Sequence, residues 1–127
     1  MPTLGEIMTG DPFSVESSAT VSEVAASMDK GRVGSAIVMD GSWLTGIFTE
    51  RDVLRAAASG KDLTSARVAD WMTPDPVTAE PSMEAEEAAQ VMLSRGFRHL
   101  PVMEDGKVTG VVSLRDVLST RVVRRPG

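Results

Sequence analysis

Apolar residues along the chain recur with helical spacing in two places, and both places carry signals for helix ends. A capping-box pattern at residues 20–23 precedes an apolar stripe over residues 21–28, which predicts an amphipathic helix. Gly31 is expected to cap the end of this helix. A second stripe over residues 85–92 predicts a matching helix, which Gly96 is expected to end.

Shorter apolar runs occur in pairs, and each pair is joined by a turn that contains Asp-Gly. This combination predicts two β-hairpins, each followed by a further helix. Short strands are expected after proline-containing bends, because the residue before proline favours extended backbone. The predicted hairpin strands are residues 35–39 with 44–48 and 100–103 with 108–112, the helices residues 50–58 and 114–122, and the short strands residues 13–15 and 77–79.

The same order of elements occurs twice, at a constant offset of sixty-four positions. Residues 4–54 align without a gap with residues 68–118, which indicates an internal duplication. The sequence therefore predicts an α/β (α+β) fold of two β-α-β-β-α repeats packed with pseudo-twofold symmetry in one compact module. The expected division is residues 1–60, a connector at 61–67, and residues 68–127.

Each repeat ends in a turn that carries a hydroxyl and, three residues later, a carboxylate. These residues are Thr49 and Asp52 in the first repeat, and Ser113 and Asp116 in the second. A hydroxyl and an acid at this spacing can satisfy the first amides of the following helix. The same turn combines a hydroxyl, a carboxylate and a positive helix terminus, which suits a ribose and a phosphate. Helix capping alone and ligand binding both remain open.

Composition narrows the class of protein. The 127 residues contain no cysteine and a single histidine, His99, so a thiolate or histidine-rich metal site is not expected. The net charge of −5 disfavours nucleic acid as a partner. Phosphate loops, dinucleotide fingerprints and nucleophile elbows are missing, so an enzyme is not expected. With no membrane-length apolar run and no signal peptide, the expected compartment is the cytoplasm.

Three motifs together resemble a known family. They are Met-Thr-x-Asp-Pro at residues 8–12 and 72–76, the strand at residues 98–102, and the paired turns described above. The chain resembles a tandem pair of cystathionine-β-synthase (CBS) domains, a Bateman module, over about residues 4–120. The resemblance implies a non-enzymatic regulatory module that binds AMP, ADP or ATP between the repeats, without an obligatory cofactor.

The resemblance also implies a homodimer that acts on a separate regulated protein. Two alternatives remain open, namely a sensor of S-adenosylmethionine or NAD(H), and a ligand-free homodimerisation scaffold. A nucleotide-processing enzyme or a nucleic-acid-binding protein is the rival from another class.

Carried over by position, the resemblance assigns roles to individual residues. Asp52 and Asp116 would accept hydrogen bonds from ribose hydroxyls, because a carboxylate offers several acceptor sites and no donor. The first repeat has Gly34 and Ser35 where the second has a basic pair, so the two sites are expected to differ, with the second preferring phosphorylated ligands. The implied ligand-binding residues are Thr49, Arg51, Asp52, Thr78, Arg98, His99, Pro101, Ser113, Arg115 and Asp116.

Overall fold

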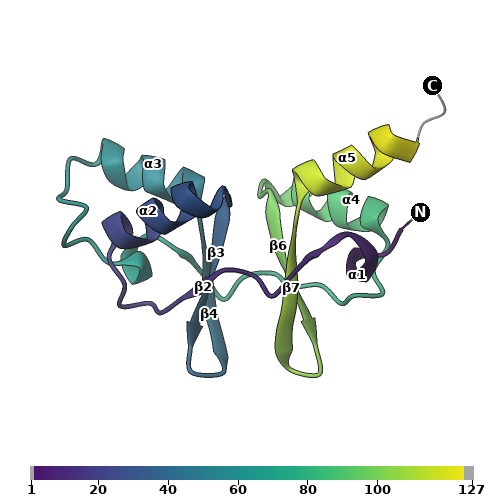
Figure 1. Cartoon of the computed structure of the whole chain (residues 1–127), viewed down its shortest axis with the longest axis horizontal. Helices are drawn as coiled ribbons and strands as arrows, with labels where there is room; N and C mark the ends of the chain where they lie inside the picture. The colour runs from purple at the N-terminus through teal and green to yellow at the C-terminus, as the bar shows by residue number, and fades with distance from the viewer. Residues whose placement is uncertain (1, 125–127) are drawn as a thin grey trace. The chain divides into compact units, whose positions relative to one another are not determined.

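A computed structural model describes residues 2–124 of the chain, with side chains through residue 119. The chain divides into two compact units, one formed by Met1–Pro12 with Val77–Gly127 and the other by Phe13–Pro76. Within the described residues it is a mixed α and β protein with five α-helices and two sheets (Figure 1), which confirms the predicted class.

The unit Phe13–Pro76 follows the predicted order of elements. Its four strands are arranged β2-β3-β4-β5, with β2 parallel to β3 and the other pairs antiparallel. The two helices α2 and α3 lie together on one side of this sheet in Figure 1. The elements are β2 (Ser14–Val15), α2 (Val21–Gly31), β3 (Ser35–Asp40), β4 (Trp43–Thr49), α3 (Glu50–Ala58), the 3-10 helix η1 (Val68–Asp70) and β5 (Thr73–Pro74).

The other unit repeats this plan with one strand fewer. Its sheet has the order β1-β7-β6, and both pairings are antiparallel. The short strand expected at residues 77–79 is reduced to an isolated parallel bridge between Ala79 and Val102. The elements are α1 (Leu4–Ile7), β1 (Thr9–Gly10), α4 (Ala85–Arg95), β6 (His99–Glu104), β7 (Lys107–Ser113) and α5 (Leu114–Arg124).

The predicted end of α4 is confirmed, whereas α2 and α5 end later than expected, and α5 runs to Arg124 rather than residue 122. Gly96 caps α4 in the left-handed conformation at φ 80°. At the end of α2, however, Arg32 rather than Gly31 adopts the left-handed conformation, at φ 55°. The amide of Val33 donates to the carbonyl oxygen of Met28 at 3.0 Å, which closes the helix one residue later than expected.

The opening segment of each repeat packs on the strands of the other repeat. Strand β1 at Thr9–Gly10 belongs to the first repeat by sequence, yet it pairs with β7. Strand β5 at Thr73–Pro74 opens the second repeat and pairs with β4. The sequence predicted bends at these prolines and did not predict this exchange. Each compact unit therefore contains segments from both repeats.

Each unit has its own apolar core, built from the residues that gave the sequence its periodic pattern. In the unit Phe13–Pro76, Val21, Val24 and Met28 of α2 pack with Phe48 of β4. In the other unit, the core is formed by residues of α4, β6, β7 and α5. These residues include Ala88, Met92, Leu100, Val112 and Val117. No helix in residues 2–124 is long and apolar enough to cross a bilayer.

Candidate functional site

The turn between β7 and α5 places Ser113 and Asp116 at one end of the sheet. The Ser113 amide donates to Oδ2 of Asp116 at 3.1 Å, and the Asp116 amide donates to Oγ of Ser113 at 3.0 Å. These reciprocal bonds confirm that the pair caps the helix. Both side chains are half-buried. The turn thus holds a carboxylate, a hydroxyl and the N-terminus of an 11-residue helix in one place.

The basic residues of the second repeat lie at this same end. His99 is the first residue of β6 and is the direct partner of Ser113 in the antiparallel ladder. The carbonyl oxygen of Arg98 accepts from the Leu114 amide at 2.8 Å, which fixes Arg98 beside the start of α5. The Arg98 and Arg115 side chains are exposed, and His99 is half-buried. Two arginines and a histidine therefore lie beside the capped turn.

Pro101 lies on β6, the strand next to β7, and Thr78 lies on the far side of β6. Pro101 is buried, and its carbonyl oxygen accepts from the Ala79 amide at 3.0 Å. Because Ala79 bridges β6 in the parallel sense, Thr78 lies toward the His99 end of that strand. Two strand spacings and an offset of two residues along β6 separate Thr78 from Ser113, which is a backbone distance of about 12 Å. The six candidate residues of this unit other than Pro101 thus lie toward one end of the sheet.

Thr78 also lines an open groove of about 760 Å³, together with Ala79 and Met103. Four carboxylates line this groove, and neither Ser113 nor Asp116 does. A groove with this charge disfavours phosphate, so it is distinct from the capped turn. The carboxylates belong to Glu80, Glu84, Glu87 and Asp105.

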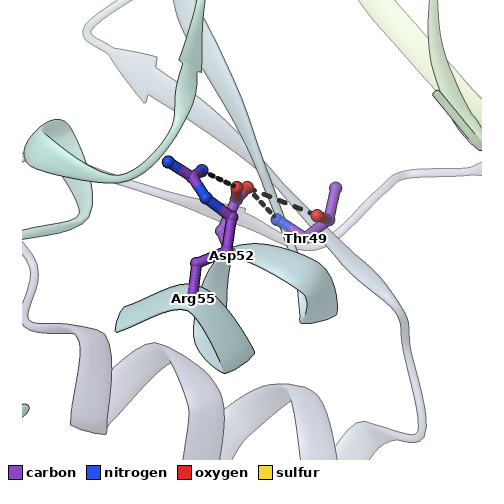
Figure 2. A network of polar contacts seen from close by, with 3 residues as sticks. All are labelled: Thr49, Asp52 and Arg55. Carbon is purple, nitrogen blue, oxygen red and sulfur yellow. Dashed lines mark hydrogen bonds and ion pairs between the residues drawn. The ribbon is translucent and has the colours of Figure 1, made fainter. Parts of the chain in front are cut away.

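The matching turn in the unit Phe13–Pro76 is built differently around its carboxylate (Figure 2). The Thr49 amide donates to Oδ2 of Asp52 at 2.9 Å, and the Thr49 hydroxyl donates to the same oxygen at 3.3 Å. Oδ1 accepts from Nη1 of Arg55 at 3.1 Å. Asp52 is only 6% exposed, so its carboxylate is enclosed by its own unit.

Arg51 of this unit is exposed at the start of α3. Ser35 pairs with Thr49 as His99 pairs with Ser113, and the Gly34 carbonyl oxygen accepts from the Glu50 amide at 3.1 Å. The two backbones thus correspond, but the basic pair Arg98 and His99 has the uncharged Gly34 and Ser35 as its counterpart.

Arg55 contacts the Asp52 carboxylate, but the sequence patterns do not single it out. Its position three residues after Asp52 is the one available signal, because residues three apart on a helix face each other. The described residues contain no group of three or more acidic or histidine side chains placed to hold a metal ion.

Comparison with known proteins decides the family. The sequence pattern of the CBS domain matches the chain twice, over residues 4–59 and 68–122. The chain belongs to the CBS domain family. As a CBS pair it is 37% identical, over 90% of its length and 70% of the relative's, to an uncharacterised 17.7 kDa protein of Acidianus ambivalens.

Solved structures of other CBS proteins share the fold. The CBS-domain-containing protein ATU1752 of Agrobacterium tumefaciens superposes with a TM-score of 0.88 at 27% identity, over 94% of this chain and 98% of the other. The Arabidopsis thaliana protein CBSX2, solved in complex with AMP, superposes with a TM-score of 0.80 at 27% identity, over 98% of this chain and all of the other. These superpositions agree with the mixed α and β architecture and the internal repeat.

Proposed function

We propose that this CBS pair is a non-enzymatic regulatory module that binds an adenine nucleotide at the turn formed by Ser113 and Asp116. One observation carries the proposal: within a single unit, Arg98 and His99 lie beside a helix-capping hydroxyl and carboxylate. A carboxylate accepts from both hydroxyls of a ribose, while arginine and the helix N-terminus stabilise a phosphate. The AMP complex of the related CBSX2 supports this ligand class.

The residues have separate roles in this proposal. Asp116 accepts from the ribose, Ser113 bonds a ribose or phosphate oxygen, and Arg98, His99 and Arg115 face the phosphate. Thr78, on the far side of β6, lies near the adenine base in this proposal. The buried Pro101 shapes β6 beside it. For binding to regulate a partner protein, the nucleotide must bind two states of the module with different affinities.

A thermal-shift panel of AMP, ADP, ATP, S-adenosylmethionine and NADH tests the proposal. At a hundredfold excess over its Kd, a ligand at one site adds about 2.7 kcal/mol to the free energy of unfolding. That corresponds to a rise in Tm of several degrees for a chain of this length. If millimolar ligand leaves Tm unchanged throughout the panel, the chain is better described as a ligand-free homodimerisation scaffold.

We also propose that the chain forms a homodimer. Leu54 of α3 is 69% exposed and Leu118 of α5 is 48% exposed, and these leucines occupy equivalent positions in the two repeats. Burial of a leucine side chain in a subunit interface contributes about 1.5–3 kcal/mol. Sedimentation at micromolar concentration is expected to give a dimer mass, and Leu54→Glu with Leu118→Glu is expected to give a monomer. A monomer mass for the wild-type chain would contradict the homodimer.

A further inference from the structure

The acidic groove beside the start of α4 combines negative charge with an apolar lining. Among the residues with described side chains, none forms a hydrogen bond or ion pair with its four exposed carboxylates. Glu84 is the N-cap residue of α4, yet its side chain bonds no amide of that helix. The half-buried Met83 and Met103 also line the groove. Such a surface suits a cationic group carried on an aliphatic stem.

The unit Phe13–Pro76 has the same backbone arrangement at the equivalent place. Arg67 bridges Thr20 there, and Thr3, sixty-four positions before Arg67, bridges Glu84 at the groove. The backbone hydrogen bonds on either side of these bridges correspond as well. The two units can therefore be compared side chain by side chain at this place.

In the unit Phe13–Pro76 an arginine of the chain itself lies at this place. Nη1 of Arg67 donates to the carbonyl oxygen of Ser18. Ser18 corresponds to Ser82, which lines the acidic groove. Thr3 replaces Arg67 in the other unit, and its hydroxyl donates instead to Glu6 at 3.0 Å. The groove thus lies where the other unit places a guanidinium, and the described residues supply none there.

The groove is also more acidic than its counterpart. Two of its carboxylates have acidic counterparts in the unit Phe13–Pro76, but Glu84 and Asp105 correspond to the uncharged Thr20 and Gly41. The counterpart therefore has two carboxylates and one arginine, whereas the groove has four carboxylates and no arginine. A ligand with more than one cationic side chain is needed to balance this charge.

We propose that the groove binds an arginine-bearing peptide segment of a partner protein. A guanidinium pairs with a carboxylate through two parallel hydrogen bonds, and the stem of the arginine packs on the two methionines. Thr78 is the one residue that the groove shares with the proposed nucleotide site, and Ser113 and Asp116 do not line it. Peptide binding in the groove therefore does not require a bound nucleotide.

Calorimetry with acetylated and amidated tri-arginine tests the proposal, with tri-citrulline as the uncharged peptide of the same shape. The wild-type chain is expected to bind one tri-arginine, and tri-citrulline at least tenfold more weakly. Glu84→Gln with Glu87→Gln is expected to weaken tri-arginine binding tenfold or more. The matched control, Glu86→Gln with Glu104→Gln, removes two exposed carboxylates that do not line the groove and should change the affinity less than twofold.

Thr3→Arg supplies the arginine that the other unit has at this place, and it is expected to weaken tri-arginine binding tenfold or more. If Thr3→Arg does not fold, the Glu84→Gln, Glu87→Gln variant decides. Equal binding of the two peptides, equal effects of the two double variants, or unchanged affinity in a folded Thr3→Arg each overturn the proposal.

Two further outcomes would assign the groove to another occupant and also overturn the proposal. Binding of Ca²⁺ without binding of tri-arginine would indicate a metal ion. A smaller oligomeric mass of the Glu84→Gln, Glu87→Gln variant in sedimentation would indicate a second copy of the chain. The AMP affinity of this variant is expected to equal that of the wild-type chain, so the groove and the nucleotide site are tested separately.

Discussion

Gly110 lies so close to Met8 that a β-carbon at Gly110 would stand 2.5 Å from the Met8 sulfur. It would also stand 2.8 Å from the carbonyl oxygen of Thr9. The equivalent Gly46 has the same relationship to Met72 and Thr73, at 2.6 and 2.8 Å. The glycine in the strand before each repeated turn is therefore required by the opening segment that pairs with that strand.

Alanine at either glycine is expected to destabilise the fold. A flexible methionine can move away from a new methyl group, but the backbone carbonyl of Thr9 or Thr73 cannot move without breaking strand pairing. We expect Gly110→Ala and Gly46→Ala each to lower the free energy of unfolding by about 1–3 kcal/mol. Denaturant titration measures this change.

Gly31→Ala is the matched control for these variants. Gly31 is the last residue of α2, and no atom lies within 4 Å of the position where its β-carbon would be. Alanine there should be neutral or stabilise the helix by about 0.5–1 kcal/mol. Equal effects at Gly31 and Gly110 would show that the pairing of β1 with β7 is not what requires glycine.

The comparison of sequence with structure shows which features local patterns determine. Helix α3 has the predicted bounds Glu50–Ala58, because its cap and apolar stripe are both local. The pairing of β1 with β7 and of β5 with β4 could not be predicted. Two copies of one sequence can pair either within a repeat or between repeats. The tight contact of Gly46 or Gly110 with a methionine distant in sequence appears only in the fold.

The candidate site was predictable in part for the same reason. The Thr49 and Asp52 cap follows from spacing on one helix, and it is present. The contact of Arg55 with Trp71, in contrast, depends on the start of the second repeat folding onto the unit Phe13–Pro76. The ligand roles of these residues stay predictions.

Asp52→Ala and Asp116→Ala are expected to separate stability from binding. Asp52→Ala leaves the Thr49 amide without its acceptor and removes the cap of α3, which should lower the free energy of unfolding by about 1–2 kcal/mol. It should largely spare AMP binding. Asp116→Ala should abolish AMP binding. Calorimetry with denaturant titration measures both effects, and loss of AMP binding in Asp52→Ala with retention in Asp116→Ala would reverse the assignment.

Asp40 predicts a pH dependence of stability in the β3–β4 hairpin. The Ser17 amide donates to its carboxylate at 3.1 Å, and the Thr45 and Ser17 hydroxyls donate at 2.9 and 3.1 Å. These bonds, the Ser17 amide first among them, hold the pKa of Asp40 below its ordinary value of 3.8. A lowered pKa in the folded state contributes stability above pH 3.8 that is lost as the pH falls through the folded value.

Asp40→Asn is therefore expected to lower Tm at pH 7 and to have a much smaller effect near pH 2.5. Thermal melts at the two pH values measure the difference. Thr45→Val removes one donor, so the pKa of Asp40 measured by NMR titration should move toward its ordinary value. A deficit in Tm for Asp40→Asn that is the same at both pH values would contradict this account.

Arg98 is expected to distinguish phosphorylated from unphosphorylated ligands. Its backbone is fixed by the Leu114 amide, just as Gly34 is fixed by the Glu50 amide, so the two units differ here in the side chain alone. A charge-assisted bond to phosphate contributes roughly 1.5–3 kcal/mol. We expect Arg98→Ala to weaken AMP binding tenfold or more while adenosine binding, measured by calorimetry, stays nearly constant. Arg95→Ala removes an exposed arginine from the end of α4 and should change neither affinity. An AMP-to-adenosine ratio that survives Arg98→Ala would remove Arg98 from the phosphate site, because no other change in the variant could compensate for the lost charge.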